Sequence, residues 1–344
     1  MSKHPKETER LRKIVESFPE TTVVVLGDLV ADEFIYGEIS RVSREAPVLI
    51  LKHRERSVLP GGGANAINNL VDLGVNVLPV GVLGDDESGR LLLKYFRHKH
   101  IPVSGILKDK NITTATKTRI LAGMPHTYRQ QVVRIDREPS SEPNSHLNRE
   151  LILATREYAR AADALLISDY GYGAATPAIL NAVREKGRLD RVPVVLDSRY
   201  RLMEYSGVTA ATPNEPEVES ALGIRIGQDW RQLCVAGQRI LSRMRLQSLL
   251  ITRGRDGMVA FPGKHRPVDI PIFGSDQAAD VTGAGDTVIA TFTAALAAGA
   301  TTEEAAHLAN YAGGIVVMKR GTATVSQKEL LQAFEKSPPM TREH

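Results

Sequence analysis

The stretch Thr22-Val23-Val24-Val25-Leu26-Gly27-Asp28 predicts the fold class of this chain. Its apolar, mostly β-branched residues follow one another without alternation, which is typical of a parallel strand covered on both faces. The predicted strand ends at Gly27, and the polar Asp28 follows directly. The same pattern, an apolar strand that ends in polar residues, recurs at 164–169, 192–197 and 248–252.

Helical patterns separate these strands. Such alternation over 344 residues favours an α/β fold with a doubly wound, mainly parallel sheet flanked by helices. In sheets of this kind, ligands bind beyond the carboxyl ends of the strands. The polar residues near those ends are therefore expected along one ligand-binding edge: Asp28, Asp32, Asp169, Asp197 and Thr252.

Residues 34–58 and 114–137 differ from the rest, because they carry alternating or β-rich runs such as Lys117-Thr118-Arg119-Ile120-Leu121. We expect antiparallel strands outside the main sheet, with a loop at 123–128 between two of them. A small sheet inserted at the ligand-binding edge would act as a lid.

The composition is that of an ordinary globular protein, with 42% hydrophobic residues, 24% charged residues and a net charge of +4. Basic residues form only short clusters, which argues against a nucleic-acid-binding face. Cys234 has no partner for a disulfide or a metal site. With no apolar signal or membrane-spanning run in this sequence, we expect a cytoplasmic protein without nucleic-acid or membrane partners. We expect residues 1–338 to form a single domain and 339–344 a disordered tail.

The run Asp280-Val281-Thr282-Gly283-Ala284-Gly285-Asp286 carries the strongest chemical signal. Small residues before an apolar helical pattern let backbone N–H groups approach a phosphate, whose charge the helix dipole stabilises. Asp286, in the first helical turn, is placed to accept a proton from an attacking hydroxyl. A plain glycine turn is the alternative, but the complete run late in an α/β chain favours phosphoryl transfer.

Three other runs each have a functional and a structural interpretation. In 60–65, glycines open the backbone, and Asn65 could bind a polyol or cap a helix. Asn214 and Glu217 could order a hydrated Mg²⁺ or form a helix capping box, and taken alone the capping box is favoured. The run 252–257 could shape a nucleotide cleft or simply be a turn before the next strand.

Together these runs resemble the signature regions of the ribokinase/PfkB family of carbohydrate kinases, over nearly all of residues 22–336. A closer resemblance, to the heptose-7-phosphate kinases of ADP-heptose synthesis, is carried by residues 36–48, 116–119, 130–136, 168–171 and 321–326. It implies transfer of the ATP γ-phosphate to the anomeric hydroxyl of D-glycero-β-D-manno-heptose 7-phosphate, for lipopolysaccharide core synthesis. It also implies Mg²⁺ and a homodimer formed through the lid, and leaves a monovalent-cation requirement open.

The resemblance implies a role for each matching residue. Asp286 would be the catalytic base, beside an anion hole formed by Gly283, Ala284 and Gly285. The sugar would be bound by Asp32, Gly62, Gly63, Asn65 and Asp169. Arginine suits bidentate phosphate contacts, so the candidates for the existing sugar phosphate are Arg41, Arg44, Arg119 and Arg134, with lid salt bridges as the alternative. Residues near ATP would be Asn214, Thr252, Gly254 and Asn310, and Mg²⁺ would lie near Asn214 and, through water, Glu217.

Two positions depart from the heptose kinases, which carry lysine where Tyr172 stands and Asp-Pro-Lys where Asp197-Ser198-Arg199 stands. These departures keep open a PfkB-type kinase for another sugar or sugar phosphate. A non-catalytic sugar-binding regulator is disfavoured by the intact run at 280–286. A nicotinamide-dependent dehydrogenase is disfavoured because residues 27–32 lack the Gly-x-Gly-x-x-Gly pattern.

Overall fold

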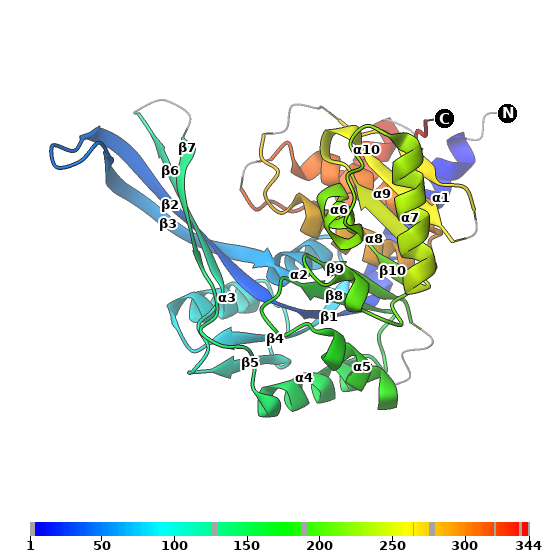
Figure 1. The fold of residues 1–344 in the computed structure, drawn as a ribbon, viewed down its shortest axis with the longest axis horizontal. Helices are drawn as coiled ribbons and strands as arrows, with labels where there is room; N and C mark the ends of the chain where they lie inside the picture. Colours follow the sequence, from blue (N-terminus) through cyan, green and yellow to red (C-terminus); the bar gives the residue numbers. More distant parts are fainter. Residues whose placement is uncertain are drawn as a thin grey trace.

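The computed structural model describes residues 4–124, 129–186, 192–263, 265–274, 279–319, 321–336 and 339–342. Two sheets organise these residues, a main sheet inside the body and a smaller one that projects from it to the left in Figure 1. The nine-stranded main sheet has the order β13 (Val268–Ile270), β12 (Met258–Pro262), β11 (Ser248–Thr252), β10 (Ala210–Ala211), β9 (Val194–Ser198), β8 (Ala164–Asp169), β1 (Thr22–Gly27), β4 (Asn76–Gly84) and β5 (Ile106–Asp109).

The main sheet is parallel from β5 to β11, and only β12 and β13 at one edge are antiparallel. The chain extends the sheet in both directions from β1, towards β4 and β5 on one side and towards β8 to β11 on the other. The predicted doubly wound fold is confirmed. Strands β1 and β8 flank the point where the strand order reverses, and Asp28 and Asp169 lie there, where ligands of such folds bind.

The continuous apolar run of β1 is explained by two hydrophobic clusters, one on each face of the main sheet. Val23 and Val25 belong to the first cluster and Val24 and Leu26 to the second, and all four are fully buried. The first cluster includes residues of α1 (His4–Glu16), α2 (Gly63–Asp72), α3 (Glu87–His98), α8 (Ala284–Ala297), α9 (Thr302–Val316) and α10 (Gln327–Lys336). The second includes residues of α4 (Ser145–Tyr158), α5 (Pro177–Lys186), α6 (Glu215–Leu222) and α7 (Trp230–Met244).

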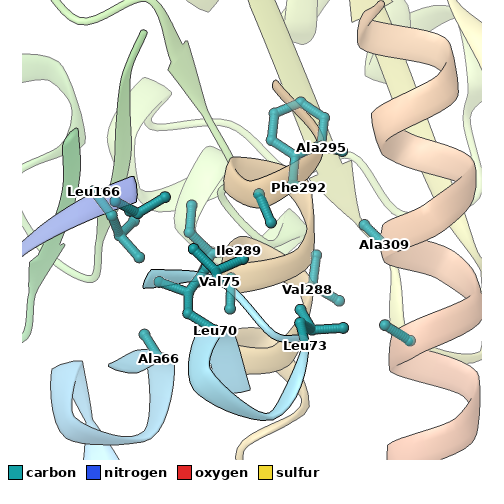
Figure 2. Packing of buried hydrophobic residues seen from close by; sticks show 14 of the residues in the cluster. Ala66, Leu70, Leu73, Val75, Leu166, Val288, Ile289, Phe292, Ala295 and Ala309 are labelled. Carbon is teal, nitrogen blue, oxygen red and sulfur yellow. The ribbon is translucent and has the colours of Figure 1, made fainter. Parts of the chain in front are cut away.

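Packing inside the first cluster positions α8, the helix that begins with the Gly-Ala-Gly run. Figure 2 shows Ile289 and Phe292 of α8 in this cluster with Leu70 of α2 and Leu166 of β8. Since these side chains are fully buried, the start of α8 is held firmly relative to the carboxyl ends of the strands. Within the described part of the chain, no helix is both long and apolar enough to cross a membrane.

The projecting sheet, called the lid below, has the strand order β3 (Leu49–Gly62), β2 (Leu29–Val42), β6 (Thr116–Gly123) and β7 (Gln130–Arg137). β2 and β3 extend further towards the body than the predicted bounds 34–58, whereas β6 and β7 lie within the predicted bounds 114–137. The pairs β2/β3 and β6/β7 are antiparallel as predicted, but β2 and β6 are parallel. The prediction failed for this pair because β2 and β6 both run outward from the body, so they cannot form a hairpin. Most of the predicted loop at 123–128 lies outside the described residues.

The end of the chain differs from the predicted disordered tail. The Arg342 amide donates a hydrogen bond to the Asp269 carbonyl at 2.8 Å, and the two residues form an isolated antiparallel bridge. Part of the 339–344 segment is therefore attached to β13 at the edge of the main sheet.

Candidate active site

The start of α8 differs from the starts of α3, α4 and α7, where an Asp or Asn side chain accepts hydrogen bonds from amides of the first turn. Helix α8 instead begins after Gly283, which has a φ of +77° and provides no side-chain cap. Among the described residues, the amides of Gly283 and Gly285 have no acceptor, whereas Ala284 donates to the Val281 carbonyl at 3.2 Å. Two of the three amides predicted to form an anion hole are thus available to a ligand, and the third is already used.

Asp286 is buried, with 5% of its surface exposed, and both of its carboxylate oxygens accept hydrogen bonds. Asn65 Nδ2 donates to Oδ2 at 2.9 Å, and the Tyr170 hydroxyl donates to Oδ1 at 2.6 Å. Asn69 and Thr287 extend this network behind Asn65. Burial raises the pKa of Asp286 to about 6, although the two hydrogen bonds lower it. A fixed carboxylate with a pKa near neutrality suits a general base.

The glycine run before α2 packs closely against the first two strands. A β-carbon at Gly62, whose φ is +53°, would lie 2.9 Å from Val30 Cγ2. The Gly63 amide donates to the Asp28 carbonyl at 3.0 Å, and Asn65 is fully buried with its amide on Asp286. Asn65 therefore supports the Asp286 carboxylate, and the direct sugar contacts of Gly62, Gly63 and Asn65 stay a prediction.

Asp28 holds the loop that follows β8. Its carboxylate accepts hydrogen bonds from the amides of Tyr170 at 2.8 Å, Tyr172 at 2.9 Å and Ala174 at 2.9 Å. Burial raises the pKa of Asp28 to about 6, against the effect of these bonds. The loop conformation that they fix places the Tyr170 side chain against Asp286.

Asp169, which we predicted to bind the sugar, is held inside the protein instead. Its side chain is 1% exposed, and Arg201 donates to both carboxylate oxygens at 2.5 and 3.1 Å. Ser198, Tyr205 and the Gly171 amide add hydrogen bonds of 2.8 to 3.0 Å. With both oxygens occupied, Asp169 connects the loops after β8 and β9, and we assign it a positioning role.

One face of the lid carries most of the charged residues predicted there. Asp32 lies opposite Lys117, and Arg119 lies opposite Arg134, so their side chains share a face. Arg119 donates to Asp32 Oδ1 at 2.7 Å, and Arg134 pairs with Asp136 at 2.6 Å. These ion pairs are the structural alternative considered for the lid arginines, and they also hold cations in place around Asp32.

A cleft of about 950 Å³ lies between the lid and the body. Its lining includes Arg54, Arg119 and Arg129 from the lid and Asp280, Thr282 and Gly321 from the body. The Arg129 guanidinium lies 5.3 Å from the Tyr36 ring centroid and forms no ion pair with the described residues. Arg41 and Arg44, the other lid arginines predicted to contact the sugar phosphate, do not line the cleft, because the β2–β3 hairpin carries them to its exposed far end.

Two smaller pockets meet at the start of α8. One, of about 270 Å³, is mainly apolar; it is lined by Met258, Ile272, Val281 and Val317, together with Gly254 and Asn310. The other, of about 260 Å³, is polar and is lined by Asp197, Arg199, Asn214 and Glu217. They share Thr252, Gly285 and Val288. An apolar pocket that continues into a polar one beside an uncapped helix start suits a nucleotide base and its phosphates.

Asn214 and Glu217 form the capping box of α6, the interpretation favoured for these residues alone. Glu217 N donates to Asn214 Oδ1 at 2.8 Å, and Asn214 N donates to Glu217 Oε2 at 2.9 Å. Burial raises the pKa of Glu217, and burial together with nearby carboxylates holds the pKa of Asp197 well above its usual value. Carboxylates destabilised in this way favour a cation, and a hydrated Mg²⁺ needs only one or two of them besides phosphate oxygens. Among the described residues, no group of three or more His, Cys, Asp or Glu side chains could hold a metal ion. A Mg²⁺ at this place would therefore depend on water and on the phosphate oxygens as further ligands.

Sequence reasoning missed two residues beside Asp286. Tyr170 directly follows β8 at the ligand-binding edge, and this position was a usable signal. Lys117 is buried on the lid, with its ammonium 4.9 Å from the Tyr170 ring centroid, and burial lowers its pKa. Only the register of β6 against β2 brings Lys117 to this face, which its sequence position does not reveal.

Comparisons with solved structures agree with this architecture. The fold is similar to that of Arabidopsis thaliana ribokinase complexed with ribose and ATP, with a TM-score of 0.70 and 21% identity over 92% of this chain and 98% of that one. It is also similar to Escherichia coli phosphofructokinase-2 in complex with fructose-6-phosphate, with a TM-score of 0.72 and 16% identity over 92% and 98%. At these identities the likeness shows a shared fold.

Sequence comparisons identify the family. The chain is 42% identical over 325 residues to the bifunctional protein HldE of Geobacter metallireducens, covering 93% of this chain and 65% of that protein. It is 36% identical over 330 residues to the HldE of Gluconobacter oxydans, covering 95% and 67%. The chain thus spans about two thirds of the length of these relatives. The pattern of the pfkB family carbohydrate kinases matches residues 20–329, and the chain is therefore a sugar kinase of the pfkB family.

Proposed function

We propose that this kinase transfers the γ-phosphate of ATP to the anomeric hydroxyl of D-glycero-β-D-manno-heptose 7-phosphate, in the cytoplasmic synthesis of ADP-heptose. The observation that carries the phosphoryl transfer is the buried Asp286 carboxylate beside the uncapped start of α8. The heptose substrate is supported by the resemblance of residues 36–48 and 116–119 to heptose kinases and by the identity to the HldE proteins.

In the proposed reaction, Asp286 accepts the proton of the acceptor hydroxyl while that oxygen attacks the γ-phosphorus of ATP. The bond from phosphorus to the bridging oxygen breaks, and ADP leaves with the bonding electrons. The amides of Gly283 and Gly285, with the α8 dipole, stabilise the charge of the transferring group. Mg²⁺ would be held near Asn214 and, through water, Glu217, where it neutralises phosphate charge when bound.

The two pockets at α8 support a placement for ATP. The adenine ring would occupy the apolar pocket near Gly254 and Asn310, and the phosphates would extend past Thr252 into the polar pocket. Arg199 lines the polar pocket and supplies a cation where the heptose kinases have lysine. The departure at 197–199 thus conserves a positive charge at this place, which favours keeping the phosphoryl-transfer assignment.

The existing phosphate of the sugar would bind in the lid cleft, and we expect Arg129→Ala to weaken this contact. Losing one charged hydrogen bond should raise the KM for the sugar phosphate about tenfold and leave the KM for ATP nearly unchanged. Steady-state kinetics with each substrate varied in turn measures both values. Arg41→Ala is the matched control, because Arg41 is a lid arginine outside the cleft. Equal increases in both KM values for Arg129→Ala would indicate collapse of the lid instead.

We further propose that two lids pair in a homodimer. The lid exposes apolar side chains, among them Val42 and Val48 at the β2–β3 turn and Val133 and Ile135 on β7, each at least 48% exposed. Apolar patches of this kind on a protein surface mark association sites. Light scattering should give about twice the 37.6 kDa mass of one chain, and replacing Val133 and Ile135 with lysine should halve it. A monomer in the unmodified protein would contradict this proposal.

The substrate assignment is tested by ADP formation from Mg-ATP with a panel of heptose 7-phosphate, fructose phosphates, ribose and fructose. We expect a selective response to heptose 7-phosphate, with kcat/KM at least about a hundredfold above the other sugars, which corresponds to about 3 kcal/mol of discrimination. Selective turnover of another sugar would retain the kinase mechanism and overturn the heptose assignment.

A further inference from the structure

Tyr170 is fixed by contacts around its backbone and its ring. Its amide donates to Asp28 Oδ2 at 2.8 Å, and its hydroxyl donates to Asp286 Oδ1 at 2.6 Å. The ammonium of Lys117 lies 4.9 Å from the ring centroid. A β-carbon at Gly62 would come within 3.2 Å of Tyr170 Cε2, so the ring edge lies against the α2 start. So many constraints leave the hydroxyl little freedom to move away from Asp286.

We propose that Tyr170 is the positioning residue for the catalytic base, fixing one oxygen of Asp286 and keeping the carboxylate ionised for proton abstraction. The inference rests on the proposed function, in which Asp286 is that base. Asn65 donates to the other oxygen, so the plane of the carboxylate is fixed from both sides. Each carboxylate oxygen has a second lone pair, which leaves room for the hydrogen bond from the acceptor hydroxyl.

The chemistry of the phenol suits this role. Burial and the nearby Asp286 carboxylate hold the pKa of Tyr170 well above its usual value, so the hydroxyl remains a donor at physiological pH. A hydrogen bond donated to a carboxylate stabilises its charged form and lowers its pKa. Burial acts in the opposite direction on Asp286 and is the larger effect. Without the Tyr170 hydroxyl, more of the base would therefore be protonated at neutral pH.

Charged groups on neighbouring strands also act on Asp286. Asp32 on β2 raises the pKa of Asp286, and Lys117 on β6 lowers it. Asp197 on β9 interacts with the same carboxylate as a like charge. Because Lys117 lies over the Tyr170 ring, Tyr170 contacts both the lid and the Asp286 carboxylate. The Tyr170 hydroxyl can be removed without changing any of these charges, so its effect can be measured separately.

The test is the pH dependence of kcat/KM in Tyr170→Phe. In the wild type, activity should fall as the pH decreases through about 6, where Asp286 becomes protonated. In the variant this acid limb should move upward by about one pH unit, with most of the activity regained at higher pH. Tyr172→Phe is the matched control, because Tyr172 lies in the same loop and contacts Asp28 through its backbone only. An acid limb at the wild-type pH in Tyr170→Phe would overturn the proposal.

A second measurement does not depend on turnover. The carboxyl carbon of Asp286 can be titrated by ¹³C NMR in aspartate-labelled protein without substrates, with Asp286→Asn identifying the resonance. We expect a higher pKa in Tyr170→Phe than in the wild type, and equal values would overturn the proposal. If the wild type phosphorylates no sugar but the resonance shifts as expected, the proposed function fails while the effect of Tyr170 on Asp286 stands.

Discussion

Asp286→Asn should lower kcat by about 10²- to 10⁴-fold, the usual contribution of a general base. Asparagine has nearly the same shape as aspartate, but its amide cannot accept a proton at neutral pH. The buried carboxylate lies in the first turn of α8, next to the amides of Gly283 and Gly285, which have no acceptor among the residues that the structure describes. Since the substitution leaves those amides in place, the KM values for ATP and for the sugar should change far less than kcat.

Two controls separate lost catalysis from lost structure in Asp286→Asn. Its thermal unfolding should remain cooperative, and it should still bind ATP, because neither nucleotide pocket is lined by the Asp286 side chain. Turnover near the wild-type rate would show that another group takes the proton. A loss of ATP binding equal to the loss of kcat would show that the carboxylate acts in binding instead.

Arg201→Leu should lower the free energy of unfolding by about 3 kcal/mol, because breaking a buried ion pair leaves an uncompensated charge. The partner, Asp169, is 1% exposed and cannot regain its hydration. Ser198, Tyr205 and the Gly171 amide would still bind Asp169, which keeps the expected loss at the lower end of the range for buried pairs. Equilibrium unfolding in urea measures this difference.

Arg199→Leu is the matched control for Arg201→Leu. Arg199 lies two residues away and is exposed to the polar pocket, so its removal should affect activity with little change in unfolding. If Asp169 contacted the sugar, as its place at the end of β8 first indicated, Arg201→Leu would raise the KM for the sugar at unchanged stability. That outcome would restore the original prediction and contradict the positioning role.

The sequence predicted those features that depend on local pattern. The apolar run of β1 indicated a strand buried on both faces, and its alternate residues do enter two separate cores. The glycines at 283 and 285 indicated an open helix start, because an uncapped first turn is a local property of the backbone. The capping box of Asn214 and Glu217 was visible from their spacing alone.

Features that depend on distant contacts could not be read in this way. Asn65 and Tyr170 lie 221 and 116 residues from Asp286 in the chain, and only the completed fold brings them to its carboxylate. The five bonds around Asp169 come from two loops and a strand end. The lid illustrates the same limit, since the alternating runs predicted its strands but not the parallel pairing of β2 with β6.

We propose that this chain phosphorylates the anomeric oxygen of a heptose phosphate, and ³¹P NMR of the reaction mixture tests this proposal most directly. With Mg-ATP and D-glycero-β-D-manno-heptose 7-phosphate, we predict a second sugar-phosphate resonance coupled to the anomeric proton, formed together with ADP. This resonance should be absent over the same period with Asp286→Asn. Release of inorganic phosphate alone, or a new resonance coupled to any other proton of the sugar, would contradict the account.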